Sequence, residues 1–245
     1  MKAKGKVWSM FMLLLITVVV TAGCGNKASN EGQKGNTAGG TETSTPTTKN
    51  DKDIVIAINS NFITLDPHNA SDTHSISAAR TMYEGLMGFD ENMNVVPVLA
   101  SSHSISEDGL VYTFTLQENV KFQDGTDFNA EAVKVNIARI QDEKNNLRLR
   151  KSFAKVAKVE TPDAKTVVIT LSEPYNAFLN KVAMAPIISP KALEENGADI
   201  SKNPVGTGPF KFKEWVQGDR LVVVKNPDYC LLYTSDAADD SLRVD

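Results

Sequence analysis

The chain has 245 residues, of which 41% are hydrophobic and 23% charged, and its formal net charge is −4. A chain of this length holds one sizeable domain or two small ones. The negative balance offers no basic surface for nucleic acid. Because Cys24 and Cys230 are the only cysteines, a disulfide framework and a cysteine-rich metal site are both excluded.

Residues 1–23 have the pattern of a signal peptide. Three lysines fall within the first six residues, and residues 7–20 are almost wholly apolar. This run is shorter than the roughly 20 apolar residues of a transmembrane helix, although an uncleaved anchor is the alternative. The ending Ala-Gly-Cys resembles a lipobox, which implies that Cys24 receives a diacylglyceryl group and becomes the mature N-terminus. Acyl chains of this kind anchor a protein stably to a membrane.

Residues 24–52 predict a tether. Between residues 25 and 52 there is no Leu, Ile, Val or aromatic residue, so the segment cannot bury apolar surface and is expected to be disordered. A flexible segment of this length spans roughly 30 Å. The alternative is a regulatory tail rich in phosphorylation sites, which the preceding signal peptide argues against.

The folded part is predicted to begin at Asp53. The apolar run Ile54–Ile58 favours a buried strand, and Pro67 holds the preceding residue extended in a turn. Ser75 is predicted to cap the start of a helix. The helix is expected to end before Gly88, because a glycine in the left-handed conformation commonly follows the last residue of a helix. The apolar positions of this helix recur at spacings of three and four: Ile76, Ala79, Met82 or Tyr83, and Leu86.

The middle of the chain predicts an α+β unit. Residues 111–116 alternate as a strand after a turn at Gly109, and Asp124-Gly125 forms a second tight turn. Asn129 is predicted to cap the helix that follows. The strand directs one set of side chains to one face, and the helix carries an apolar stripe: Tyr112, Phe114 and Leu116 for the strand, Ala130, Val133, Ile137 and Ile140 for the helix.

Two more strands are predicted at residues 155–160 and 166–171, followed by a helix within 175–184. Ser189-Pro190 predicts the start of another helix, which ends at Gly197. Residues 203–229 contain a glycine–proline bend and then a hairpin whose turn is Gln217–Asp219. Strict alternation would place two aromatic side chains on one face of its first strand and the third on the other: Phe210 and Phe212 opposite Trp215.

Motifs of catalysis and metal binding are weak or absent. His68 and His74 lie close to Asp66 and Asp72, which leaves a metal site open, but the spacing is wide for zinc and no sulfur ligand is near. The segment Gly206–Gly208 is too short for a phosphate loop and lacks the lysine that would follow it. We therefore expect no metal, no cofactor and no enzymatic activity.

Several ordered motifs resemble one protein family. They are NFITLDPHNASDT, MYEGLMGFD, VKFQDGTDFNAEAV, and PVGTGPF followed by EW, GD and KNPDY. Together they resemble the family 5 solute-binding proteins of bacterial ABC importers, which bind dipeptides, oligopeptides, nickel chelates and glutathione. The pieces NFITLDP, SDT and FQDGTDFNA are most similar to the glutathione-binding branch.

The resemblance implies an α/β fold, the two-lobed periplasmic-binding-protein type II (cluster C) fold, present only in part. It divides the folded residues into a first pass through lobe I (53–84), a small inserted α+β domain (85–187) and a second pass through lobe I (188–229). By the same resemblance, the large second lobe would follow Tyr229.

The last residues, 230–245, are predicted to be foreign to the natural protein. Translated backwards, CLLYTSDAADD matches a transposase mosaic-end sequencing adapter read in frame. A genuine amphipathic C-terminus is the alternative.

The function implied by the resemblance is capture of glutathione or a short peptide outside the cell. The protein would be held by its lipid anchor on the extracytoplasmic face of the cell membrane, or lie in the periplasm, and would deliver its solute to an ABC permease and ATPase. The residues that match the family's ligand-touching loop are Ser71, Asp72 and Thr73. The alternatives are a secreted lipoprotein enzyme such as a peptidase, and a peptide-sensing receptor or adhesin without a transport role.

Overall fold

The computed structural model of the chain describes residues 54–229. The predicted signal peptide, tether and adapter-derived tail, and with them Cys24, lie outside the described residues. From residue 55 onward the described residues belong to one compact unit.

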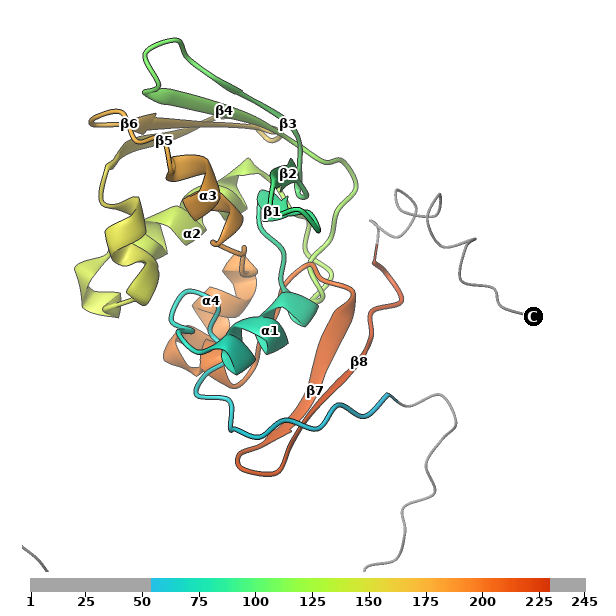
Figure 1. Ribbon diagram of the computed structural model, residues 1–245. Coiled ribbons are helices and arrows are strands. Elements are labelled where there is room, and N and C mark those ends of the chain that lie inside the picture. Colours follow the sequence, from blue (N-terminus) through green and yellow to red (C-terminus); the bar gives the residue numbers. More distant parts are fainter. Residues whose placement is uncertain (1–53, 230–245) are drawn as a thin grey trace, which may run out of the picture. The chain divides into compact units, whose positions relative to one another are not determined.

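A four-stranded antiparallel sheet lies at one end of the described part (Figure 1). Its strands, in spatial order, are β3 (Ala100–Ile105), β4 (Val111–Leu116), β6 (Thr166–Leu171) and β5 (Val156–Asp163). The predicted alternation of β4 is confirmed, because Tyr112, Phe114 and Leu116 are buried while the residues between them are more exposed. Gly109, in the turn before β4, has a φ of 69°, which favours glycine.

Helices cover the inner face of this sheet. α2 (Ala130–Gln141) begins at the predicted cap, where the Asn129 side chain accepts a hydrogen bond from Ala132 N at 3.0 Å. Its predicted apolar stripe is buried. α3 (Phe178–Ala183) adds Phe178, whose ring meets that of Tyr112 edge-on at 4.9 Å. Two 3-10 helices follow α2 along the chain, η1 (Glu143–Asn145) and η2 (Arg148–Phe153). The buried residues of this region, all within 86–187, are here named the sheet cluster.

A second hydrophobic core, here named the hairpin cluster, forms at the other end of the described part (Figure 1). It contains Leu65, residues of α1 (Thr73–Met82) and residues of α4 (Pro190–Asn196) and η3 (Gly197–Ser201). The hairpin of β7 (Phe210–Val216) and β8 (Arg220–Lys225) packs against it. Ser189 caps α4 with Pro190 at its first position, as predicted, and Gly197 ends it.

The chain passes between the two clusters twice, and the two passages lie side by side. Gly85 pairs with Pro186 in an isolated antiparallel bridge, and Ile187 N donates to Glu84 O at 2.8 Å. Just beyond, β1 (Met87–Phe89) pairs with β2 (Val95–Pro97). The boundary between the clusters thus falls near residues 84–86 and 186–188. The predicted domain division stays a prediction.

Three expectations for the first part of the chain were wrong. Residues 54–58 form no strand, and Ile54, Val55 and Ile56 are 87%, 75% and 80% exposed, because no neighbouring strand pairs with them. The cap of α1 is Asp72, not Ser75, because the Ser75 hydroxyl accepts hydrogen bonds from Ile63 N and Thr64 N instead. Gly88 lies in β1, since α1 already ends at Met82.

The hairpin also departs from strict alternation. The register of β7 against β8 shifts between Phe212 and Glu214, which is the signature of a β-bulge. The extra residue brings Phe212 and Trp215 onto the same side, where both pack against the hairpin cluster. Phe210 remains 40% exposed.

Candidate ligand-binding site

The segment Asp66–Thr73, here named the 66–73 loop, is built from tight local hydrogen bonds. Asp66 O accepts from Asn69 N at 3.1 Å and from Ala70 N at 3.0 Å, and Asp66 Oδ1 accepts from His68 N at 3.0 Å. Pro67 favours the extended conformation of the residue before it. The loop therefore has a defined course before the chain enters α1.

A buried ion pair fastens this loop to α2. Arg139 donates from both terminal nitrogens to the Asp66 carboxylate, at 2.7 and 3.2 Å, and the two side chains are only 14% and 8% exposed. An arginine that donates two parallel hydrogen bonds to one carboxylate is held in a more specific geometry, as well as bound more strongly, than one that donates a single bond. The loop is thus held at a fixed position against the sheet cluster.

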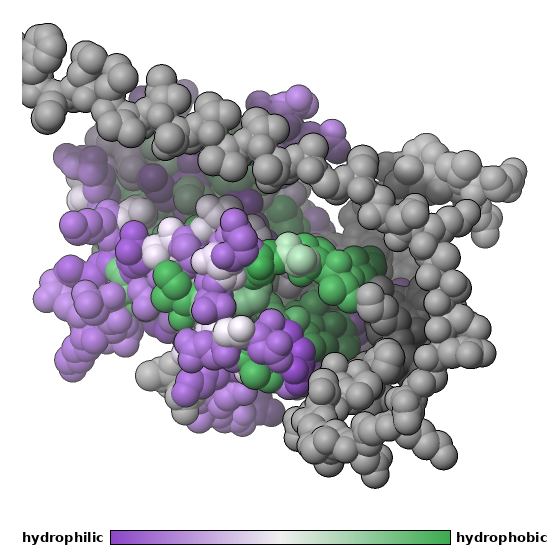
Figure 2. Space-filling view, turned by 60° about the horizontal axis from the view of Figure 1, so that its bottom comes forward, coloured by the Kyte–Doolittle hydropathy of each residue, from purple (hydrophilic) through white to green (hydrophobic). Residues whose placement is uncertain are grey.

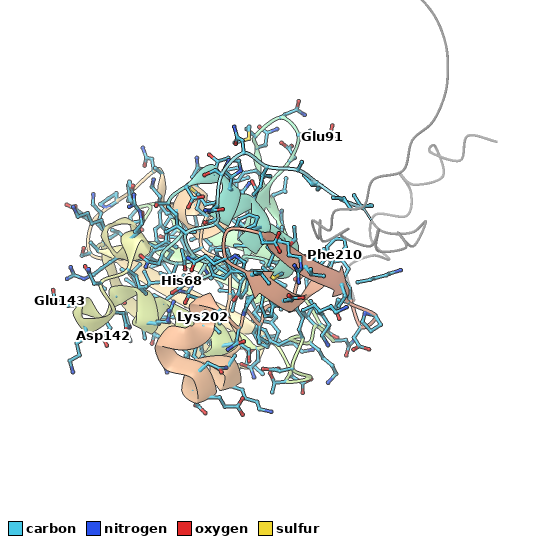
Figure 3. The ribbon with its side chains drawn as sticks, turned by 90° about the horizontal axis from the view of Figure 1, so that it is seen from below. His68, Glu91, Asp142, Glu143, Lys202 and Phe210 are labelled. Carbon is cyan, nitrogen blue, oxygen red and sulfur yellow. The ribbon has the colours of Figure 1, made fainter. Side chains whose placement is uncertain are left out.

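His68 completes this attachment from inside the folded part (Figure 3). Burial lowers the pKa of His68 to about 4, with the Arg139 charge acting in the same direction and the Asp66 carboxylate opposing it. The neutral ring donates from Nε2 to Pro186 O at 2.8 Å and accepts at Nδ1 from Arg139 at 2.8 Å. Both ring nitrogens are therefore engaged, and neither is free to bind a metal. Among residues 54–229, no group of three or more His, Cys, Asp or Glu side chains could hold a metal ion.

The three predicted ligand-binding residues lie together where the loop meets α1, in different environments. Ser71 and Thr73 are exposed. Asp72 accepts a hydrogen bond from Ser75 N at Oδ1, 2.8 Å away, while its Oδ2 is buried and has no partner. Burial by itself would raise the pKa of Asp72, but the hydrogen bonds from Ser75 outweigh it and hold the pKa below its usual value. Asp72 thus acts as a helix cap, and the exposed hydroxyls flank it.

The bend Gly206–Gly208 lies against the end of α1. A Cβ atom on Gly206 would stand 2.3 Å from Met82 O, and one on Gly208 would stand 2.6 Å from the Met82 carbonyl carbon. Real Cβ atoms essentially never come closer than 3.0 Å to such neighbours. Glycine is therefore required at both positions so that the backbone can approach the helix.

Gln123 links this bend to the sheet cluster, a role that the sequence did not reveal. Its side-chain nitrogen donates to Met82 O, Gly208 O and Phe210 O at 3.1, 3.1 and 2.7 Å. Its backbone N donates to Gly206 O at 2.9 Å. The turn that carries Gln123 also holds α4, because Asp124 Oδ2 accepts from the Ser189 hydroxyl at 2.5 Å.

Glu84 lies at the crossing between the clusters. Its carboxylate accepts from the Thr207 hydroxyl at 2.9 Å and from the Tyr229 hydroxyl at 2.5 Å. Burial raises the pKa of Glu84, although these two hydrogen bonds oppose the shift. Burial and the neighbouring Glu84 likewise raise the pKa of Tyr229 well above its usual value. These two hydrogen bonds join the first passage of the chain to residues that follow the second passage, and paired polar contacts of this kind favour a single fixed arrangement.

Three comparisons with known proteins bear on this arrangement. The family model described as bacterial extracellular solute-binding proteins, family 5 Middle, matches residues 94–242. The glutathione-binding protein GsiB of Salmonella typhi is 48% identical over 180 residues, which are 73% of this chain and 35% of that protein. The chain therefore spans about a third of the length of the relatives it matches.

Solved structures agree on the fold. The binding protein AgaA of A. tumefaciens R10, in complex with agropinic acid, matches with a TM-score of 0.65 and 34% identity over 68% of this chain and 34% of its own. NikZ of Campylobacter jejuni, in complex with Ni(L-His), matches with a TM-score of 0.64 and 34% identity over 69% of this chain and 34% of its own. The predicted fold class, a partial type II periplasmic-binding-protein fold, is confirmed. Within the described residues, no helix has the length and apolar character needed to cross a membrane.

Proposed function

The chain belongs to family 5 of the bacterial extracellular solute-binding proteins, and we propose that it forms part of the lipid-anchored binding component of an ABC importer for glutathione or short peptides. The observation that carries this proposal is the 48% identity with glutathione-binding proteins over 180 residues. The relatives matched here are binding proteins, not enzymes. On the basis of the same family membership we also propose delivery to a permease and an ATPase, and a position on the extracytoplasmic face of the membrane or in the periplasm.

The mechanism we propose is closure of two lobes on the solute without any chemical step. Residues 53–84 and 188–229 would belong to lobe I, with 85–187 as the inserted domain. The two hydrophobic clusters support this division, because their members separate near residues 84–86 and 186–188. The hydrogen bonds and the ion pair of Gln123, Asp66 and His68 would make the lobe I residues and the inserted domain move as one body.

We propose that the facing lobe comes from further chain, since the relatives are about three times as long as the matched part. The exposed apolar residues support this. Figure 2 shows apolar side chains gathered on the face where the 55–62 segment and the β7–β8 hairpin lie. The exposed large apolar residues of these two segments are Val55, Ile56, Ile58, Phe210, Val216 and Val224. An apolar surface of this extent is typical of an interaction site.

The solute would be bound at the start of α1, where Ser71 and Thr73 are exposed. Hydroxyl groups suit the polar ends of a peptide. Glutathione or a short peptide fits better than a nickel chelate, because no group of three or more His, Cys, Asp or Glu side chains among the described residues could hold a metal ion, and both ring nitrogens of His68 in this loop are already engaged.

Asp72 offers a test that separates binding from folding. If its charge takes part in solute binding, Asp72→Asn should weaken glutathione binding at least about fivefold while leaving stability within about 0.5 kcal/mol, because Asn is an equally good helix cap. Asp72→Ala should also lose about 1 kcal/mol of stability with the cap. Calorimetry and urea denaturation measure the two effects. Affinities of both variants within twofold of the wild type would remove Asp72 from the binding site.

Membrane attachment through Cys24 remains a proposal, since this residue lies outside the described part of the chain. It rests on the charged start, the apolar run and the Ala-Gly-Cys ending of the signal peptide. Mass spectrometry of the mature N-terminus decides it. A cleaved N-terminus without a lipid would contradict the proposal.

The experiment that tests the function is calorimetry with glutathione, oxidised glutathione and di- to pentapeptides. It should be run on the 245-residue chain and on the protein encoded by the complete reading frame. We expect tight binding only by the longer protein, because this chain would supply one wall of the cleft. Release of hydrolysis products would favour a peptidase instead, and the absence of permease and ATPase genes nearby would favour a receptor.

A further inference from the structure

The 3-10 helix η2 lies directly against the 66–73 loop. Leu149 N donates to His68 O at 3.2 Å. By the covalent geometry of the chain, the Cα atom of Arg148 is therefore no more than roughly 6 Å from that oxygen. Leu147 and Phe153, on either side of Arg148, are both buried, and Phe153 belongs to the sheet cluster. The backbone of Arg148 thus has a defined position beside the loop that carries Ser71 and Thr73.

Arg148 differs from most arginines of the described part in having no partner. Three of the others form ion pairs: Arg139 with Asp66, Arg150 with Glu143, and Arg220 with Glu214 and Asp219. Among the arginines of residues 54–229, only Arg80 and Arg148 have neither an ion pair nor a side-chain hydrogen bond. The acidic residue closest along the chain, Glu143, is already engaged by Arg150. An unpaired charge beside a solvated helix is common, but Arg148 stands on a segment anchored to the candidate site.

We propose that Arg148 binds a carboxylate of the solute, and the proposal rests on the function proposed above. The guanidinium group offers a planar fork of donors that matches a carboxylate in geometry and charge. The exposed hydroxyls of Ser71 and Thr73, on the neighbouring loop, are further donors for a carboxylate. Because Asp66, Arg139 and His68 hold this loop, and Leu149 N holds the backbone of Arg148 beside it, the backbone on both sides is in place before the solute arrives, which limits the entropy lost on binding. The solute class is therefore one with a free carboxylate at this end, as in glutathione.

A cycle of variants and ligands tests this assignment in the protein from the complete reading frame. The variants are Arg148→Gln, which removes the charge, and Arg148→Lys, which keeps the charge and loses the fork. Arg80→Gln is the matched control, since it removes the other unpaired arginine. The ligands are glutathione, its glycine amide, and 4-aminobutanoyl-Cys-Gly, which lacks only the α-carboxylate of the glutamyl end.

We expect Arg148→Gln to weaken glutathione binding roughly 10- to 100-fold, the range typical of a hydrogen bond to a charged group. Arg148→Lys should fall between this variant and the wild type, and Arg80→Gln should change affinity less than twofold. The effect of Arg148→Gln should vanish for one of the two analogues, which then identifies the carboxylate. Equal losses for all three ligands, or no loss for glutathione, would overturn the assignment. If the wild-type protein binds none of the three ligands, the proposed function itself is wrong, and the assignment of Arg148, which rests on it, is overturned as well.

Discussion

Replacing Gly206 with alanine should destabilise the protein by about 3 kcal/mol or more, the upper end of the range for overpacking a tight contact. The new Cβ would stand 2.3 Å from Met82 O and 2.5 Å from Tyr83 Cδ1. Neither neighbour can easily move, because Met82 O already accepts from Gly208 N at 2.9 Å and the Tyr83 side chain is buried. Either α1 or the bend must shift, and the contacts of Gln123 would be lost with it. Urea denaturation of the 245-residue chain followed by circular dichroism measures the loss.

Gly218→Ala is the matched control for this variant. Gly218 has a φ of 82° and nothing within 4 Å of its would-be Cβ. Alanine there should cost about 1 to 2 kcal/mol through backbone conformation alone, whereas Gly206 tests steric contact alone. If Gly206→Ala proves no more destabilising than Gly218→Ala, the close approach of the bend to α1 is not important for stability.

Features set by near neighbours in the chain could be predicted from the sequence. The caps Asn129 and Ser189 act on residues three positions away, and Gly125 and Gly218 lie in turns that need a positive φ. The strand β4 follows its period of two because both of its neighbours are strands of the same sheet. The one wrong cap shows the limit. Asp72 and Ser75 are both suitable residue types, and the choice between them was made by the backbone of residues 63 and 64, which engages Ser75.

Features that depend on distant partners could not be predicted in this way. The apolar run of residues 54–58 has the composition of a strand, but a strand needs a neighbour to pair with, and none pairs with it among the described residues. Gln123 and Arg139 have partners 41 to 87 residues away, so no local pattern marks them. The candidate binding loop was found through the family resemblance, and what the sequence missed is how Arg139 and His68 hold it.

Arg139→Met should destabilise the protein about as much as Gly206→Ala does, but for an electrostatic reason. It would leave the Asp66 carboxylate, 8% exposed, without its cation, and it would also remove the donor to His68 Nδ1. Removing one member of a buried ion pair typically costs about 3 to 5 kcal/mol, because the remaining charge stays buried and unpaired. Arg139→Lys, which keeps the charge but loses the fork, should cost less and keeps the experiment informative if the methionine variant does not fold.

The double variant Asp66→Asn with Arg139→Met distinguishes the buried charge from the lost packing. The amide that replaces the Asp66 carboxylate keeps an oxygen that can accept from His68 N, and no charge is left without a partner. We therefore expect the double variant to be more stable than Arg139→Met alone, since the effects of contacting residues are not additive. If the double variant is instead as unstable as the sum of the two single variants, the pair holds the loop through shape and packing. The 66–73 loop would then owe its position to His68 and Pro186 more than to the ion pair.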